Sequence, residues 1–198
     1  MDFELNSILS VMKKKEYIIF ENGSTNLIGV RGSSSVPNTF NDKLYYICLG
    51  SRNIFKKYDV TTDPGTPYLL KPINPKGTLI MKPGQHKGLW MIGKHRGKYD
   101  ALVQVGYCTV LRDNNKNNVL DFNTTLEETN NNFGANCHKA ANGIISKWVG
   151  PHSAGCIVHA DANRFDNEFM VDIKHDAKIW GNRFTFTLLE EKDFKEVV

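Results

Sequence analysis

The chain has 198 residues, of which 40% are hydrophobic and 23% charged, a composition typical of a globular protein. The 11% of aromatic residues argues against a disordered chain. Twenty-five basic and 21 acidic side chains leave a net charge of +4, a mild excess that suits an anionic surface without demanding nucleic acid. The length suits one substantial core, so we predict a single domain without nucleic-acid binding.

Residues 1–16 predict a short N-terminal helix. Leu5, Ile8, Leu9 and Met12 recur at helical spacing, with Asp2 as the candidate cap. The basic residues follow the apolar part, which reverses the order of a secretory signal, so we expect no signal peptide. No apolar stretch approaches the roughly 20 residues of a membrane span, and we expect no membrane insertion.

From residue 17 to residue 198 we predict one mainly β domain. Short β-branched or aromatic runs alternate with Gly, Pro, Asn and Asp, which is the rhythm of an antiparallel sandwich or barrel. The runs are EYIIFE, NLIGVRG, KLYYICLG, TLIMKPG, GLWMIGKH, DALVQVGYCTVLRD and RFTFTLLE.

Residues 113–132 are polar and rich in asparagine, which predicts a long loop between strands. Asp113, Asn115, Asn117 and Asp121 place side-chain oxygens at the first, third, fifth and ninth positions of a calcium-loop pattern. Asn118 replaces the usual glycine, and Thr124 stands where a bidentate glutamate is usual. Calcium is therefore one interpretation, and a plain Asx-rich turn is the other.

An amphipathic helix is predicted after the last cysteine. Its apolar face has Phe165, Phe169, Ile173, Ala177 and Trp180, and Gly181 is placed to end it.

Four cysteines lie far apart in a chain that is long enough to fold without disulfides, so we expect unpaired thiols. Cys48 and Cys108 sit in strand-like apolar runs and are expected to pack in the core. Cys156 is different, because it stands in KWVGPHSAGCIVHAD, behind Gly155 and between histidines.

A catalytic cysteine needs a base, a place for the oxyanion and access for substrate. His138 in FGANCH, 18 residues before Cys156, is the candidate base, and neighbouring strands can close that separation. Gly155 leaves the approach to the thiol open and permits backbone amides to face a developing negative charge. A buried packing thiol and a metal ligand remain the alternatives for Cys156.

The metal alternative uses Cys137, His138, Cys156 and His159, which could supply four N or S ligands to zinc. However, Cys137 and His138 are adjacent, and on a strand their side chains would point to opposite faces. Cys137 is the one expected to face the core.

The His138 segment and the Ser153-Ala-Gly-Cys156 segment resemble the signature of the L,D-transpeptidase catalytic domain, in a form similar to phage-encoded relatives that act on peptidoglycan. The resemblance extends over most of residues 17–189. Further matching segments are PNTFND, TTDPGT, PKGTLIMKPGQHKGLWMIGKHRGKYDALVQ, LRDNNKNNVLDF and IWGNRFTFTL.

The resemblance implies that Cys156 attacks a stem-peptide carbonyl while His138 accepts the thiol proton. Amides near Gly155 would hold the oxyanion, and Ser153 would orient the loop or His138, or simply cap its own turn. The chain departs from the family at Lys139, where a glycine is usual, and at Val158 and His159, where an arginine is usual. We therefore expect cleavage of the stem peptide through an acyl-enzyme, in preference to transpeptidation with a second peptide strand.

Four further residues are candidates for substrate binding. Arg96 could bind a stem-peptide carboxylate through its planar guanidinium group, with His95 beside it, and Arg31 is a weaker candidate of the same type. His152 could contact substrate or join the catalytic pair. Structural or plainly exposed roles are the alternatives for all of them.

The leading prediction is thus a cysteine peptidase or L,D-transpeptidase-like enzyme that needs no cofactor. Its expected partner is bacterial peptidoglycan, at the cell wall or in the periplasm, where it would arrive as part of a phage virion or by release at lysis. One rival is a non-catalytic wall-binding or virion structural protein, and another is a zinc-dependent hydrolase.

Overall fold

The computed structural model describes residues 3–33, 36–124 and 126–196, and its architecture is mainly β, as predicted. Asp2, the candidate helix cap, lies outside the described residues. The strands are β1 (Thr25–Arg31), β2 (Asp42–Cys48), β3 (Ile54–Thr61), β4 (Thr78–Met81), β5 (Gly84–His95), β6 (Tyr99–Gln104), β7 (Cys108–Asp113), β8 (Glu127–Asn130), β9 (Cys137–Lys139), β10 (Ile157–His159) and β11 (Phe184–Glu190).

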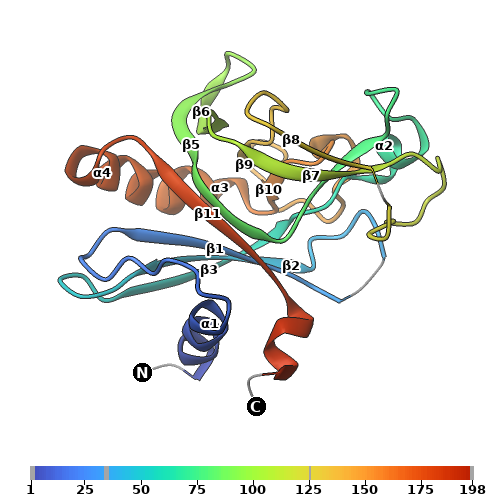
Figure 1. Cartoon of the computed structure of the whole chain (residues 1–198). Helices are drawn as coiled ribbons and strands as arrows, with labels where there is room; N and C mark the ends of the chain where they lie inside the picture. The colour runs from blue at the N-terminus through green and yellow to red at the C-terminus, as the bar shows by residue number, and fades with distance from the viewer. Residues whose placement is uncertain (1–2, 34–35, 125, 197–198) are drawn as a thin grey trace.

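Among the described residues, eight strands close a barrel in the order β1-β11-β5-β6-β9-β10-β3-β2, and β4, β7 and β8 form a second sheet (Figure 1). The helical segments are α1 (Phe3–Lys14), α2 (Thr66–Leu70), the 3₁₀ turn η1 (Gly150–His152), α3 (Ala162–Arg164), the π-helical η2 (Phe165–Phe169), α4 (Met170–Trp180) and the 3₁₀ segment η3 (Glu191–Glu196).

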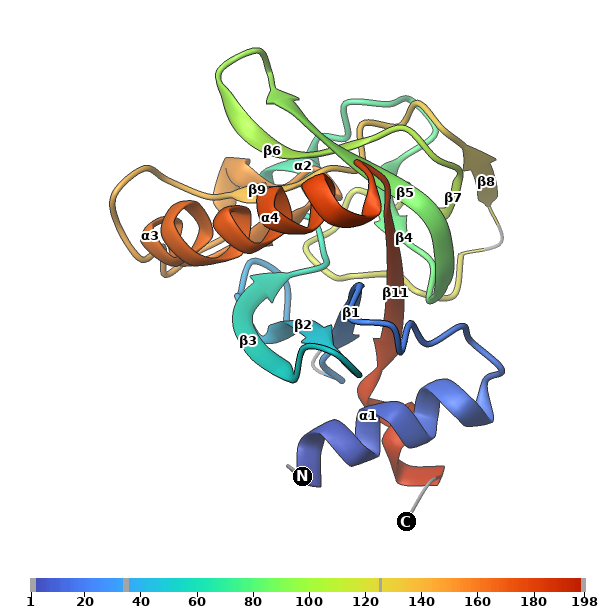
Figure 2. The same ribbon diagram turned by 90° about the vertical axis from the view of Figure 1, so that its left-hand side faces the viewer.

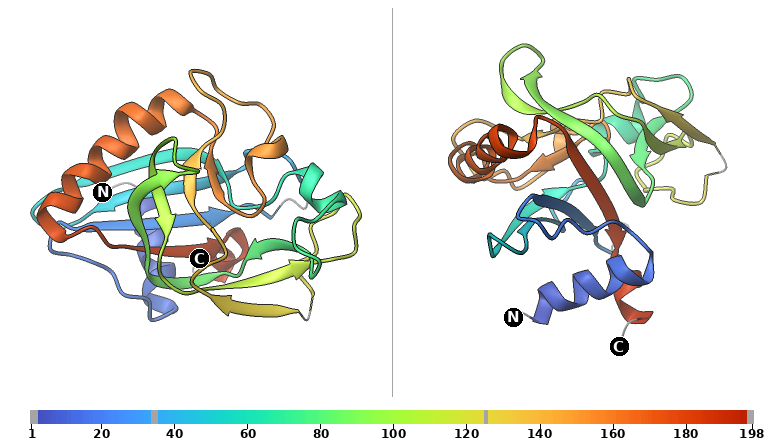
Figure 3. Two further views of the ribbon diagram at one scale, coloured as in Figure 1. Left: turned by 90° about the horizontal axis from the view of Figure 1, so that it is seen from above. Right: turned by 60° about the vertical axis from the view of Figure 1, so that its left-hand side comes forward.

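The barrel contains both parallel and antiparallel pairs, whereas the sequence pattern predicted an antiparallel sandwich or barrel. β1 pairs with β11 in parallel, and β9 pairs with β10 in parallel. Both parallel pairs join strands that are separated by long connections, because a tight hairpin can only join antiparallel neighbours. In Figure 3, β11 runs from the upper layer of the molecule to its lower edge and links the two halves of the barrel.

The run EYIIFE at residues 16–21 is not a strand, although its composition predicted one. Its backbone amides and carbonyls form hydrogen bonds with side-chain amides, and not with the backbone of a neighbouring strand. Gln85 bonds the amide and the carbonyl of Ile18 at 3.0 and 2.9 Å, and Asn26 does the same for Phe20 at 2.8 and 2.9 Å. The run is therefore an extended connection tied to the outside of the barrel.

The N-terminal helix forms at the predicted place and packs under the sheet. Its face of Leu5, Ile8, Val11 and Met12 is buried against side chains of β1, β2 and β11. Figure 1 shows α1 and η3 side by side below β1–β3, and Lys15 forms a 2.8 Å ion pair with Asp193 of η3. The helix is thus part of the folded body.

The predicted helix after Cys156 is present as the continuous sequence α3, η2 and α4. Phe165, Phe169 and Ile173 are fully buried in the main core, as the pattern predicted, and Ala177 packs against it. Trp180, by contrast, is 43% exposed, because the helix end extends past the core. Gly181 ends the helix with a φ of +93°, a conformation that a glycine adopts without strain.

Ion pairs hold this helix between the two layers of the barrel (Figure 2). Lys56 of β3 contacts Asp172 at 2.5 Å, and Asp100 of β6 contacts Lys174 at 2.7 Å. The Tyr46 hydroxyl in the barrel interior donates to the buried carboxylate of Asp176 at 2.5 Å. The helix is therefore fixed on the side of the barrel where β9 and β10 lie.

None of the helices in the described ranges combines the length and the apolarity that crossing a membrane requires.

Candidate active site

The pairing of β9 with β10 places His138 and Cys156 on one face. In this parallel pair Ile157 lies opposite Cys137, and Val158 lies opposite His138. Side chains alternate along a strand, so Cys137 and Ile157 enter the core, where both are fully buried. Cys156 precedes Ile157 and therefore shares the face of His138. The 18-residue separation is closed by strand pairing, as predicted.

A cavity of about 190 Å³ opens at this face. Cys156 is half-buried at its wall, whereas Cys48, Cys108 and Cys137 are buried, and all four thiols are free. The expected absence of disulfides is thus confirmed for these cysteines. The cavity is lined by Leu79, His95, Arg96, Phe133, Gly134, Ala135, Asn136, His138, His152, Ala154, Gly155 and Cys156.

His138 is held as a neutral base. Its Nδ1 lies 2.7 Å from the backbone carbonyl of Lys139, which can only accept, so Nδ1 carries the proton and Nε2 has a free lone pair. The Tyr99 hydroxyl donates to the same carbonyl at 3.3 Å. Burial, together with the neighbouring His95, lowers the pKa of His138 to about 3. The imidazole is therefore unprotonated near neutral pH.

His95 is stacked on His138, with ring centroids 3.9 Å apart and an interplanar angle of 22°. Its Nδ1 lies 3.2 Å from Asn136 Nδ2. Because Asn136 Oδ1 accepts from the Gln104 amide at 2.8 Å, Nδ2 is the donor, which leaves the His95 proton on Nε2. Burial and the charge of Arg96 lower the pKa of His95 as well. The two rings form a neutral stack of fixed tautomers.

The thiol of Cys156 is also uncharged at rest. Its Sγ donates to the Gly134 carbonyl at 3.3 Å. Burial raises the pKa of this thiol, while hydrogen bonding from the Asn136 backbone and the charge of Arg96 act in the opposite direction. The cavity is therefore lined by a neutral thiol and a neutral imidazole rather than by a thiolate and an imidazolium.

Ser153 orients the loop that carries the cysteine. This serine is fully buried, and its hydroxyl donates to the Cys156 carbonyl at 2.9 Å and accepts from the Gly155 amide at 3.2 Å. Of the roles predicted for Ser153, these contacts fit the orientation of the loop and the capping of its own turn, and not a bond to His138. They also engage the Gly155 amide, so an oxyanion would have to be met by another amide of this segment.

The backbone conformation at position 155 favours a glycine, in addition to the open approach to the thiol that the sequence predicts. Its φ is +117°, and a Cβ at this position would lie 2.5 Å from the Leu79 carbonyl oxygen. The loop thus presses directly on β4, and this contact sets the position of the neighbouring Cys156.

Changing Gly155 to Ala should lower the free energy of unfolding by roughly 2–3 kcal/mol, because it adds a backbone clash to the strain of a positive φ. Gly143→Ala is the matched control, since Gly143 also has a positive φ, +69°, with nothing within 4 Å of a Cβ. Urea unfolding of both variants checks this expectation. Equal losses of stability would contradict the role given to the Leu79 contact.

His95, Arg96 and His152 all line the cavity, so the structure brings three predicted substrate-binding residues to the cavity of Cys156. Arg96 is exposed in the β5–β6 turn, with a φ of +49°. Arg31 is instead 2% exposed and donates to the carbonyls of Thr62 and Met81. Arg31 therefore holds the fold together and is not available to substrate.

The positions that depart from the L,D-transpeptidase pattern are buried. Val158 is fully buried, and the His159 ring is packed against the rings of Tyr58, Phe165 and Phe169 at centroid distances of 4.6–5.3 Å. Burial, with a smaller effect of His138, lowers the pKa of His159 to about 3. Lys139 is also buried and forms a 2.5 Å ion pair with Asp166. None of these positions supplies a cation to the cavity.

The four predicted zinc ligands do not converge. Cys137 and His159 face the core, whereas His138 and Cys156 face the cavity. Within the described residues, no group of three or more His, Cys, Asp or Glu side chains could hold a metal ion. The zinc interpretation is therefore wrong for this set.

The calcium candidates Asp113, Asn115, Asn117 and Asp121 are not among the residues that line the cavity.

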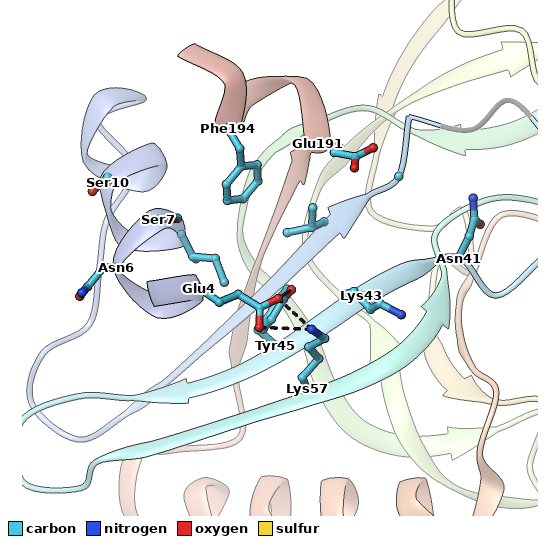
Figure 4. A pocket seen from close by; sticks show the side chains of 13 residues that line it. Glu4, Asn6, Ser7, Ser10, Asn41, Lys43, Tyr45, Lys57, Glu191 and Phe194 are labelled. Atoms are coloured by element: carbon cyan, nitrogen blue, oxygen red, sulfur yellow. Dashed lines mark hydrogen bonds and ion pairs between the residues drawn. The ribbon is translucent and has the colours of Figure 1, made fainter. Parts of the chain in front are cut away.

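A larger cavity of about 810 Å³ lies on the opposite side, between α1, β1–β3 and η3 (Figure 4). Its charged groups already have partners. Lys57 contacts Glu4 at 2.9 Å, and the Tyr45 hydroxyl donates to the same carboxylate. Lys43 is paired with Asp59, and Glu191 accepts from the Ser33 amide. No cysteine or histidine is among its lining residues. The smaller cavity is therefore the better candidate for chemistry.

Sequence reasoning missed Asn136 and Tyr99. Asn136 precedes His138 by two residues on an extended segment, so strand alternation could have placed both on one face. Tyr99 is brought to Lys139 only by the folding of β6 onto β9, and its sequence position carries no signal of this contact.

No protein-family model, curated protein or solved structure matches this chain.

Proposed function

We propose that the protein is a cysteine-dependent peptidoglycan stem-peptide hydrolase, or an L,D-transpeptidase, that works through an acyl-enzyme. The observation that supports this most is that a half-buried thiol and a neutral histidine line the same cavity. His138 has a free Nε2 lone pair, as a general base requires. The motifs around Cys156 and His138 point to the same chemistry.

In the proposed reaction, His138 Nε2 takes the Cys156 proton as Sγ attacks the carbonyl carbon of the stem peptide. The carbonyl π electrons move to oxygen, and a backbone amide of the Cys156 segment stabilises that oxyanion. Collapse of the tetrahedral intermediate breaks the C–N bond, and the proton on His138 passes to the leaving amine. Water or a second amine then attacks the thioester and restores the thiol.

The charged groups around the cavity suit a substrate that carries a carboxylate. Arg96 lines the cavity from an exposed turn, and its guanidinium can bind a carboxylate through two parallel hydrogen bonds. His95 presents a neutral Nε2–H, and His152 lies on the wall formed by η1. These three residues are the proposed substrate contacts.

Water is the proposed acceptor rather than an amine strand. The family's usual arginine is replaced by Val158 and His159, and both are buried. Apart from Arg96, the lining residues include no lysine or arginine that could hold a second acidic peptide. The proposed place of action is the bacterial cell wall, reached from a phage virion or after release at lysis.

A non-catalytic wall-binding or virion structural protein is the second candidate. Two observations favour it: the pKa of Cys156 is raised, and the resting thiol donates to Gly134 rather than to His138. Such a protein would retain peptidoglycan binding without turnover.

Incubation with purified peptidoglycan tests the proposal. We expect soluble peptide fragments by mass spectrometry from the untreated protein and none after its thiols are alkylated. Adding a D-amino acid as acceptor separates the two reactions, because hydrolysis leaves free carboxyl ends whereas transpeptidation adds the acceptor mass. Co-sedimentation with peptidoglycan without fragment release would exclude the enzyme and support the binding protein.

A further inference from the structure

The loop after β7 contains a buried carboxylate without a cation. Asp113 ends β7 and is 1% exposed, although the following residues 114–119 are exposed. Leu120 returns to the interior, in a small apolar cluster with Leu69, Ile80 and Leu111. The chain thus leaves the core at Asp113 and re-enters it at Leu120, with the polar segment curved between them.

One oxygen of this carboxylate is unsatisfied. Asp113 Oδ2 accepts from the Asp121 amide at 3.0 Å, which shows that the carboxylate faces the loop. Asp113 Oδ1 is buried and has no hydrogen-bond partner. A buried carboxylate oxygen without a partner is costly, and such groups are generally paired or bound to a metal.

No basic side chain among the described residues offsets this charge. The adjacent Arg112 is directed to Glu128 at 2.9 Å, and Lys116 is exposed in the loop. Since the Asp121 amide bonds Asp113 Oδ2, the carboxylates of Asp113 and Asp121 belong to the same part of the loop.

Further oxygens lie along the same curve. Asn115 Oδ1, Asn117 Oδ1 and Asp121 Oδ1 accept from the amides of Asn117, Val119 and Asn123 at 3.1, 2.8 and 2.9 Å. Each of these oxygens keeps a second lone pair. Neutral and charged oxygens, without histidine or thiolate, are the ligand set that calcium prefers.

We propose that the loop from Asp113 to Asp121 binds one calcium ion, with the Asp113 carboxylate as its buried anchor. Asn115, Asn117 and Asp121 complete the side-chain oxygens, and backbone carbonyls and water fill the remaining positions. The site has two carboxylates and two carboxamides, which places it at the weak end of protein calcium sites, with a Kd on the order of 0.1–1 mM. The proposal does not depend on the chemistry of Cys156.

Calorimetry on the full chain, stripped with EGTA, tests this site. We expect one Ca²⁺ per chain, with at least tenfold weaker binding of Mg²⁺, which demands a stricter geometry. In 10 mM CaCl₂ the melting temperature should rise by about 3–8 °C over 10 mM MgCl₂. Absence of saturable calcium binding up to 10 mM would overturn the proposal.

Three variants locate the ion. Asp121→Asn should weaken calcium binding at least tenfold while the chain stays folded, because Asp121 is partly exposed. Asp59→Asn is the matched control, since Asp59 is exposed on β3 and paired with Lys43, and it should bind calcium as the wild type does. Asp113→Asn should abolish the calcium-dependent rise in melting temperature. Unchanged calcium affinity in Asp121→Asn, or an unchanged calcium-dependent rise in Asp113→Asn, would show that the ion is not held by this loop.

Discussion

Cys156→Ala should lower the release of peptidoglycan fragments by about 10³-fold or more, because the proposed acyl-enzyme cannot form without Sγ. The side chain is half-buried at a cavity wall, so its removal leaves little new empty space in the core. The melting temperature should therefore stay close to that of the wild type. Fragment release at equal protein concentration, followed by mass spectrometry, measures the effect.

Cys137→Ala is the matched control for this experiment. Cys137 is one residue from His138 but points into the core, and the same side-chain change there costs stability without removing the nucleophile. Its folded fraction should release fragments at the wild-type rate. If Cys156→Ala retained the activity and Cys137→Ala lost it, the nucleophile would have been assigned to the wrong cysteine.

His138→Gln should lower kcat about 10²–10⁴-fold, the usual contribution of a general base. Glutamine retains a polar side chain of similar reach but cannot accept the thiol proton. His175→Gln is the control, because His175 lies on α4 with a 57% exposed side chain, and its activity should be that of the wild type. Comparable losses in both variants would indicate a general effect on folding rather than the removal of a base.

The pH dependence gives His138 a second test. Because the folded-state pKa of His138 is lowered to about 3, its imidazole should stay neutral as the pH falls from 7 to 5. We therefore expect kcat/KM to change less than about twofold over this range, whereas a base with the ordinary pKa of 6.5 would lose about 25-fold. A steep loss centred near pH 6.5 would show that His138 is not the neutral base described above.

The same protonation affects stability. Unfolded histidine takes up a proton near pH 6.5, but His138 and His159 do so only near pH 3 in the folded protein. The unfolded state thus binds more protons between these values, and the free energy of unfolding decreases as the pH falls through this window. Activity at pH 5 is therefore to be compared at a temperature where the protein is still folded.

Apolar runs in the sequence predicted the strands whose side chains lie in the core. They gave a wrong strand where side-chain amides, and not a neighbouring strand, bond the backbone. β1, β2 and β11 follow from their runs of buried residues. β3 was not predicted, because Lys57 and Asp59 make its exposed face polar and Lys56 interrupts the apolar side chains of the other face. Residues 16–21 have the composition of a strand, but their backbone bonds go to Gln85 and Asn26, which local patterns do not indicate.

Some features of the candidate site could likewise be predicted from local sequence patterns, and others could not. Motif spacing predicts that His138 and Cys156 come together, and both line one cavity; glycine chemistry predicts the permissive backbone of Gly155. The stack of His95 on His138 depends on the β5–β6 hairpin folding over β9, and the burial of His159 depends on the helix that covers it. Such contacts form between distant segments, so no local pattern predicts them.

The parallel pairing of β1 with β11 has a consequence for the order of folding. Leu27 lies opposite Phe186, so the barrel closes only when two segments from near opposite ends of the described chain meet. Contacts of such long sequence separation slow folding, because the entropy of closing the loop is lost before the contact stabilises it. The residues that line the cavity around Cys156 all precede β11 in the chain, but the barrel that carries β9 and β10 closes only when β11 joins β1 and β5. The frame that supports the proposed nucleophile would therefore be completed only in the last step of folding.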